Sequence, residues 1–290
     1  MPRRRKKTRM SPFAFFYTLL GLAVGSFLNL CIHRIPGGES IVTPGSRCPH
    51  CKKPVRPYDN IPLVSYLVLR GKCRFCKSAI SFRYPLVEVL TGLAFWGCLE
   101  VWGFTPPTLV NSLFLSLLIV LVFVDYDHQV LPDKVTKPGI VAGLFLSPFQ
   151  SEALFQDPLS YGIAASLPDV DPENLLPWAG SLLGALVGGG ILWITGYVYQ
   201  MVRKKPGLGL GDVKMMAMVG AFLGWRMALL TIFVGSLSGS ILGIFLIIFK
   251  GRTLQTKLAF GTLLGGGAAF SLFFGLSFVR WYHARLLERF

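Results

Sequence analysis

Four of the six cysteines form two C-x-x-C pairs, with 21 residues between the pairs. They are Cys48, Cys51, Cys73 and Cys76. Each pair places two thiolates on one tight turn, and two pairs supply the four sulfur ligands, at ~2.3 Å each, of a tetrahedral zinc site. Four sulfurs leave no coordination position for a water, so the pattern predicts a structural zinc that holds its loop folded. The alternatives are free buried thiols or a disulfide pair.

Four acids lie inside or at the ends of long apolar segments, where an ionisable group is costly and is therefore a candidate for function. They are Glu88, Glu100, Asp125 and Asp212. Asp125 opens the sequence DYDHQVLPD, and Asp212 closes the glycine-rich sequence GLGLGD. Glu88 and Glu100 stand within one apolar segment, where polar links between helices are an equal alternative.

Asp125 and Asp212 have the chemistry of an aspartyl pair if folding brings them together. Two carboxylates within about 3 Å share one proton, so one activates a water and the other polarises a carbonyl. The glycines before Asp212 allow a substrate strand to approach and leave the backbone free to adopt positive φ. The alternative is an ion pair of each aspartate with Lys134 or Lys214. Two further acids could replace Asp125 and are otherwise solvated or capping residues: Asp127 and Asp133.

The segments that must position these residues are apolar enough for a membrane protein. Of 290 residues, 52% are hydrophobic and 15% are charged, against roughly 45–50% and roughly 25% in soluble domains. This composition argues against a soluble chain and excludes a disordered one. The net charge of +15 comes from short basic blocks between apolar runs. Such blocks are typical of membrane-flanking loops and not of a nucleic-acid interface.

Six segments are predicted to cross the membrane, because a spanning helix needs about 20 mainly apolar residues. They are residues 12–32, 86–103, 109–124, 178–202, 227–249 and 258–279. Two shorter segments, 135–149 and 213–223, are ambiguous by hydropathy. With them the prediction is an all-α polytopic membrane protein of about eight transmembrane helices, with a small cytoplasmic zinc-binding loop domain. Cys31 and Cys98 lie inside apolar segments and are expected to be buried.

Loop charges predict the orientation of the chain. Residues 34–84 carry ten Lys or Arg and two acids, whereas residues 151–177 carry five acids and no Lys or Arg. Because cytoplasmic loops are enriched in Lys and Arg, the first loop is predicted inside and the second outside, which requires all eight segments to span. The cysteines and both helix-end aspartates then face the cytoplasm. The basic cluster at residues 3–9 would lie outside, unless the first segment is a hairpin or an interfacial helix.

Four motifs follow one another along the chain. They are GLAVGSFLNLCIHRIP at 21–36, the C-x-x-C pairs around NIPLVSY at 60–66, the spacing from Asp125 to Pro132, and GLGDVK at 209–214. Together they resemble the bacterial type IV prepilin peptidases, from about Gly21 to about Gly265. The Gly-x-Gly-Asp element alone is shared with archaeal preflagellin peptidases and presenilin-like intramembrane proteases.

The resemblance implies a bifunctional enzyme of the bacterial inner membrane. Such proteins cut the basic leader of prepilins and type II secretion pseudopilins after a Gly on the cytoplasmic side. They then methylate the new N-terminal residue, usually Phe, with S-adenosylmethionine. Asp125 and Asp212 match the family's catalytic aspartates, and the four cysteines match its zinc ligands. The N-terminal loop is associated with methyl transfer, with no contacts to the methyl donor assigned.

The resemblance also implies three domains. They are residues 1–33, the basic N-terminus and first span; 34–84, the zinc-binding domain associated with methyl transfer; and 85–290, the transmembrane aspartyl peptidase domain. The chain departs from the family pattern at Pro206, where an acid often precedes the glycines, and in its basic residues 1–10. The acidic stretch 151–177 is expected to be an extended external loop that is peripheral to catalysis.

Two other functions are compatible with the carboxylates. A proton-coupled transporter with a regulatory zinc loop would also carry them, although the chain lacks the internal repeat that transporters tend to show. A peptidase without methyl transfer would keep the same aspartates. The expected partners are prepilins, pseudopilins and membrane lipid, and no nucleic acid.

Overall fold

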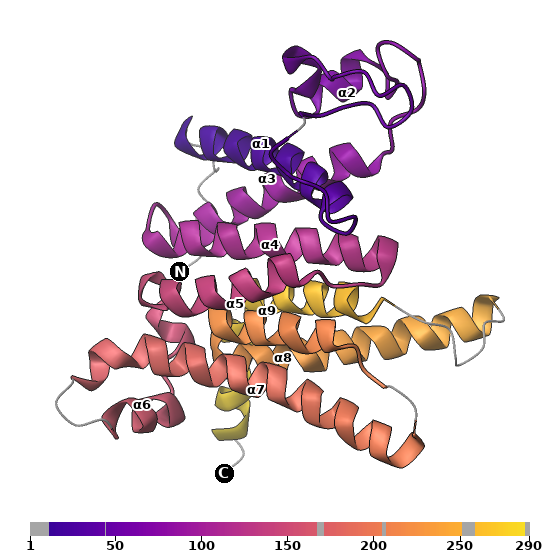
Figure 1. Ribbon diagram of the computed structural model, residues 1–290. Coiled ribbons are helices and arrows are strands. Elements are labelled where there is room, and N and C mark those ends of the chain that lie inside the picture. The colour runs from indigo at the N-terminus through magenta and orange to yellow at the C-terminus, as the bar shows by residue number, and fades with distance from the viewer. Residues whose placement is uncertain (1–11, 44, 167–170, 205–206, 251–258, 288–290) are drawn as a thin grey trace. The chain divides into compact units, whose positions relative to one another are not determined.

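The computed structural model describes residues 12–43, 45–166, 171–204, 207–250 and 259–287. These residues form nine α-helices, three short 3₁₀ turns and two isolated β-bridges, with no strand among them (Figure 1). The predicted all-α fold is confirmed. The chain divides into two compact units, residues 1–116 and 117–290, and the division falls inside α4 (Pro106–His128).

Six of the described helices are long and apolar enough to cross a membrane. They are α1 (Pro12–Arg34), α3 (Arg83–Trp102), α4, α7 (Pro172–Arg203), α8 (Leu210–Lys250) and α9 (Phe260–Leu287). The two shorter predicted segments are also helical: one forms α5 (Asp133–Leu146) and the other begins α8. α8 bends at Gly224, whose φ of 77° is non-helical, so its two parts match two separate predicted segments. The expectations for the basic N-terminal cluster and for Pro206 concern positions outside the described residues.

In the first unit, α1 packs against α3 through small residues. Gly21 faces Phe95, and Gly25 faces the backbone at Glu88. A Cβ on these glycines would lie 2.8 and 2.7 Å from the nearest atoms. Helices in a membrane associate by close packing, which small residues permit. The glycines therefore hold α1 and α3 together as a pair.

Residues 35–82, named here the cysteine module, connect α1 to α3 and contain a 3₁₀ turn, η1 (Pro57–Asn60), and the short helix α2 (Val64–Val68). The guanidinium of Arg34, at the end of α1, donates to the carbonyls of Ser40 and Gly45 at 2.9 and 3.1 Å. The side chain of Asn29 donates to the carbonyl of Tyr84 at 2.9 Å. The bonds of Arg34 tie the module to the end of α1, and the bond of Asn29 ties α1 to the start of α3.

In the second unit, the first part of α8 is enclosed by its neighbours. Met215, Met216 and Met218 are fully buried. Gly184 of α7 lies against the backbone of Gly220, so closely that a Cβ on either would collide with the carbonyl of the other. The contact brings α7 and α8 together backbone to backbone, which places Asp212 at the start of a buried helix.

The described part of the acidic stretch is not an open loop, because it contains a 3₁₀ turn, η3 (Glu152–Leu154), and α6 (Pro158–Ala165) and runs into α7. Another 3₁₀ turn, η2 (Ser147–Phe149), follows α5. Asp157 caps α6, accepting from the N–H groups of Leu159 and Ser160, and also accepts from the indole N–H of Trp225 at 2.9 Å. Since Trp225 follows the bend at Gly224, this cap also holds the bend.

Candidate functional site

The four predicted zinc ligands meet within the cysteine module. The sulfurs of Cys48, Cys51, Cys73 and Cys76 all lie within 4.8 Å of one another. The sulfurs of Cys48 and Cys76 are 3.7 Å apart, and tetrahedral bonds of ~2.3 Å to zinc imply sulfurs about 3.8 Å apart. All four thiols are free, so the disulfide alternative is wrong. The cluster can therefore hold a metal, and four thiolate donors suit zinc.

Both C-x-x-C turns are built in the same way. The N–H of Cys48 donates to the carbonyl of Lys53 at 3.0 Å. The N–H of Cys73 donates to the carbonyl of Ser78 at 2.8 Å. In each turn the residue after the second cysteine has a φ of 58°: Lys52 and Lys77. A positive φ is uncommon outside glycine, and its repetition shows that both turns reverse the chain identically to aim two thiols at one point.

The thiols do not ionise together without a cation. Hydrogen bonds from Ser78 lower the pKa of the Cys76 thiol to about 6. At Cys51 a hydrogen bond from the backbone of Lys53 lowers the pKa, but loss of solvent and the neighbouring thiols together outweigh it and raise the pKa to about 11. A bound metal ion removes this conflict, because it stabilises all four thiolates at once.

Arg74 ties the second turn to the rest of the module. It lies between Cys73 and Cys76, and its guanidinium donates to both carboxylate oxygens of Asp59 at 2.8 and 2.6 Å. Hydrogen bonding and charge from Arg74 hold the pKa of Asp59 below its ordinary value. Arg74 also lies over the ring of Tyr58, 5.4 Å from its centroid. The metal turn is thereby fixed to the 3₁₀ turn before α2.

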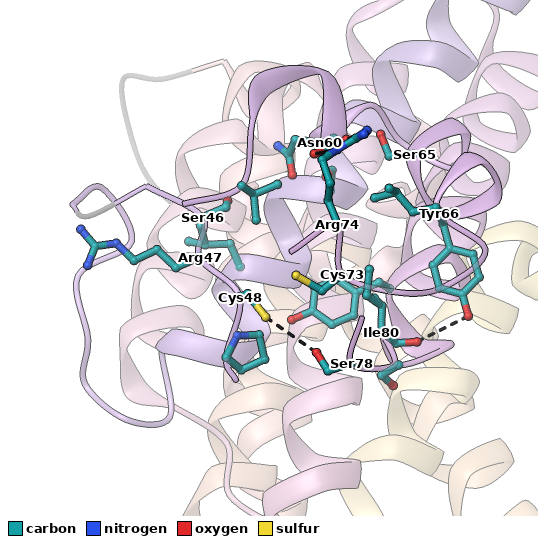
Figure 2. A pocket seen from close by; sticks show the side chains of 18 of the residues that line it. Ser46, Arg47, Cys48, Asn60, Ser65, Tyr66, Cys73, Arg74, Ser78 and Ile80 are labelled. Atoms are coloured by element: carbon teal, nitrogen blue, oxygen red, sulfur yellow. Dashed lines mark hydrogen bonds and ion pairs between the residues drawn. The ribbon is translucent and has the colours of Figure 1, made fainter. Parts of the chain in front are cut away.

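A cavity of about 410 Å³ lies beside the metal cluster, within the first unit (Figure 2). Its wall includes Cys48 and Cys73 from the cluster, Asn60 and Tyr66 from the module, and Glu88 from α3. The volume falls within the roughly 300–1,000 Å³ of pockets that enclose small molecules. The cavity thus joins apolar, aromatic and polar groups at the junction of the module with α1 and α3.

Asp125 is buried in the last turns of α4 and is contacted from α9. The N–H of Thr262 donates to Oδ2 of Asp125 at 2.7 Å, and the hydroxyl of Thr262 lies 3.1 Å from the same oxygen. Gly261 packs on the carboxyl group, since a Cβ there would lie 3.0 Å from the carboxyl carbon. Thr262 is in the first turn of α9, where unpaired N–H groups and the helix dipole favour a negative charge.

Asp212 lies half-buried in the first turn of α8 and interacts electrostatically with Asp125. Leu131 packs on a glycine beside or opposite each carboxylate: on Gly211, which precedes Asp212, and on Gly261, which packs on Asp125. A Cβ on Gly211 would lie 2.9 Å from this leucine side chain, and one on Gly261 would lie 3.1 Å from it. The second unit therefore brings the two predicted aspartates to the same place, where α4 ends and where α8 and α9 begin.

The alternative ion pairs of these aspartates do not form among the described residues, and Lys214 pairs with Asp133 instead. Lys214 donates to Asp133 at 2.6 Å, and Lys137 pairs with the same carboxylate at 2.8 Å. Neither predicted pair is present in the part of the chain that the structure describes: Asp125 with Lys134, and Asp212 with Lys214. Asp133, at the start of α5, is thus paired with two lysines.

The remaining candidates have other surroundings. Glu88 is buried, and its Oε2 accepts from the N–H of Leu63 at 2.9 Å, so it links α3 to the module. Glu100 and Asp127 are exposed. The two remaining cysteines are buried, as predicted: Cys31 and Cys98.

Comparison with known proteins identifies the family. A prepilin leader peptidase/N-methyltransferase of Pseudomonas aeruginosa is 36% identical to this chain, over 93% of the chain and 94% of that protein. The chain belongs to the type IV leader peptidase family. The family model of that description matches residues 112–244, and the bacterial peptidase A24 N-terminal domain matches residues 19–102.

Two further family members carry the same name. The protein of Neisseria gonorrhoeae is 37% identical, over 88% of each chain. That of Myxococcus xanthus is 42% identical over 83% of this chain, which covers 65% of that longer relative. No solved structure matches the chain. Membership of this family favours a membrane peptidase with methyltransferase activity over the transporter hypothesis.

Two features of the aspartate site were not predicted. The sequence gives only one indication for Thr262. It follows Gly261 near the start of an apolar run, where a helix can begin. The glycines at 207, 209 and 211 do not adopt the positive φ that the sequence allowed. Gly211 acts through its size instead, because it lets Leu131 approach.

Proposed function

We propose that this chain is an aspartyl endopeptidase of the bacterial inner membrane that uses Asp125 and Asp212 to remove the basic leader of prepilins and pseudopilins after a Gly. It then methylates the new N-terminal residue. The observation that carries the proposal is the meeting of two carboxylates at the ends of apolar helices, in a chain of this family. Two carboxylates in this arrangement can divide the roles of acid and base.

The two carboxylates have different surroundings, and this difference assigns their roles. Asp125 accepts hydrogen bonds from Thr262, which favour its charged form. Among the described residues no hydrogen-bond donor reaches the carboxyl of Asp212, so the shared proton stays there. Asp125 is therefore the base that activates water, and Asp212 is the acid that polarises the scissile carbonyl.

The position of the pair suits a substrate that enters from the bilayer. Asp125 ends α4 and Asp212 begins α8, so both lie where apolar helices meet the membrane surface. The ten basic residues at 34–84 favour a cytoplasmic position for that loop, and the same rule of loop charges supports a cytoplasmic position for the ends of α4 and α8 that carry the aspartates. A prepilin has its basic leader in the cytoplasm and its apolar segment in the bilayer, so its scissile bond lies at this surface.

Substitution of each aspartate tests the peptidase assignment. We expect Asp125→Asn and Asp212→Asn each to abolish leader cleavage of a purified prepilin, with zinc content and membrane insertion unchanged. Mass spectrometry of the product N-terminus measures cleavage, and Asp127→Asn is the matched control because this carboxylate is exposed nearby. Cleavage at the parental rate in either pair variant would remove that residue from the mechanism.

We assign the methyl donor to the cavity of the first unit, whose volume suits a small molecule. S-adenosylmethionine supplies an activated methyl group that the released α-amine attacks. The aromatic ring of Tyr66 and the amide of Asn60 offer stacking and hydrogen bonds to its adenosyl group. The buried carboxylate of Glu88 offers an acceptor for a ribose hydroxyl or for an amine.

Binding of the donor can be measured apart from turnover. We expect Tyr66→Ala and Asn60→Ala to weaken binding of labelled S-adenosylmethionine in equilibrium dialysis by at least tenfold, while leader cleavage stays unchanged. Incubation of a prepilin with and without the donor, read by the mass of the product N-terminus, then tests methylation. Unchanged donor binding in both variants would move the donor site out of this cavity.

A further inference from the structure

Helix α2 exposes its apolar residues. Val64, Leu67 and Val68 lie at positions i, i+3 and i+4, so they share one face of the helix, and they are 53%, 73% and 69% exposed. Ser65 on the inner side is buried, and Tyr66 lines the cavity (Figure 2). A helix on a water-exposed domain turns its apolar stripe inward. The three outward residues, named here the α2 apolar face, therefore point to a non-aqueous environment.

α2 is attached to a helix that is long and apolar enough to span a membrane. The N–H of Leu63, just before α2, donates to Oε2 of Glu88 at 2.9 Å. Leu63 has a φ of 59°, a conformation that a branched side chain rarely adopts unless its surroundings hold it there. Glu88 is the sixth residue of α3, about 7.5 Å from its start at 1.5 Å per residue. α2 therefore lies beside the first turns of α3, at the depth of the membrane interface.

The surroundings of α2 are cationic. Arg70 and Lys72 follow the helix directly, and both are exposed. Residues 34–84 contain ten basic residues and two acids, and one of these acids, Asp59, is already paired with Arg74. Exposed apolar residues beside cations are the combination that binds the boundary between anionic headgroups and acyl chains.

We propose that α2 is an interfacial anchor that inserts its apolar face into a bilayer containing anionic phospholipid, while Arg70 and Lys72 bind the phosphates. The anchor holds the cysteine module, and the cavity wall that α2 contributes, on the membrane surface beside α3. It requires that α3 spans the bilayer, and it does not depend on the catalytic roles of Asp125 and Asp212. Its failure and the failure of the proposed peptidase mechanism are therefore separate results.

Photocrosslinking of the full-length protein in nanodiscs tests the anchor. Benzoylphenylalanine is placed at Leu67 or, as the control, at Phe75, which is 40% exposed in the second metal turn. In nanodiscs of phosphatidylethanolamine and phosphatidylglycerol, mass spectrometry should find at least tenfold more lipid adduct at position 67 than at position 75. The adduct at 67 should fall at least threefold when phosphatidylcholine replaces phosphatidylglycerol, or when Arg70 and Lys72 are both changed to Gln.

Hydrogen exchange provides the second measurement. In the double variant Leu67→Gln and Val68→Gln, whose side chains are not part of the core, the amides of α2 should exchange at least ten times faster in the same nanodiscs, with zinc content unchanged. Equal lipid adducts at positions 67 and 75, or unchanged exchange in the double variant, would overturn the proposal. An adduct at position 67 that forms only with added prepilin would assign the face to substrate and would also overturn it.

Discussion

The metal cluster and the aspartate pair are built by different means. The cluster takes its four thiols from 29 consecutive residues, in two turns with the same hydrogen bonds and the same positive φ after the second cysteine. The aspartate pair takes its parts from α4, α8 and α9, and the bond between Asp125 and Thr262 joins residues 137 positions apart. The cluster needs two local turns and a metal, whereas the pair needs the packing of a whole helical unit.

This difference implies that substitutions in the two units should affect different properties of the protein. A change in the cysteine module should affect metal binding first, and a change in the packing of the second unit should affect cleavage first. Each site lies within one of the two compact units of the chain. Four variants test the separation, in order of decreasing effect.

Replacing Cys48 and Cys51 by Ser has the largest expected effect, since a structural zinc contributes on the order of 10 kcal/mol to the folding of a small module. Bound zinc, measured by mass spectrometry of the purified protein, should fall from one per chain to near zero. Leader cleavage should keep at least a tenth of the parental rate. Cys31→Ala, in α1, is the control and should keep the metal. Complete loss of cleavage in the double variant would show that the second unit depends on the cluster.

Gly184→Ala should destabilise the second unit by about 3 kcal/mol, because the added Cβ collides with the backbone of Gly220. Thermal unfolding and cleavage should both be impaired, while zinc content stays the same. Gly190→Ala is the matched control on the same helix, since a Cβ there meets open space. Equal behaviour of the two variants would show that the backbone contact between α7 and α8 is unimportant.

Thr262→Val should lower kcat about tenfold and leave KM nearly unchanged, because it removes one hydrogen bond of about 1.5 kcal/mol to Asp125 and no contact with substrate. Thr262→Ser keeps the hydroxyl and should restore the rate. Thr195→Val removes an exposed hydroxyl that donates to the carbonyl of Ile191, and it should have no effect. A serine variant as slow as the valine variant would argue that Thr262 acts through packing alone.

Asp157→Ala has the smallest expected effect. Burial raises the pKa of Asp157, but hydrogen bonds from Ser160 and Trp225 outweigh it and hold the pKa below its ordinary value. Such a carboxylate stabilises the folded state above the unfolded pKa of about 3.9 and loses that contribution as the pH falls through the folded pKa. The variant should lose about 1 kcal/mol at pH 7, and less below about pH 4, in thermal unfolding.

Asp171→Ala is the control for this measurement, because Asp171 precedes α7 without a side-chain capping bond. It should leave the stability unchanged across the same pH range. A loss in Asp157→Ala that is as large at pH 3 as at pH 7 would contradict the linkage.

Local sequence determined the features that depend on neighbouring residues. Apolar runs of sufficient length predicted the helices, and even the ambiguous segments 135–149 and 213–223 lie largely in α5 and in the first part of α8. The C-x-x-C spacing predicted the metal cluster, because a tight turn is specified by a few adjacent residues. The scarcity of acids in apolar segments singled out Asp125 and Asp212, because an ionisable group in a membrane segment is costly and marks a candidate functional site.

Only the tertiary structure decided which distant groups meet. Lys214 could have paired with Asp212 or with Asp133. Helix packing brings it to Asp133, and the two form an ion pair. Thr262 reaches Asp125 because α9 begins where α4 ends, and an apolar run does not encode that arrangement. The lipid-facing and buried sides of a membrane helix are both apolar, so hydrophobic periodicity does not tell them apart, and the partners of each face are set by helix packing.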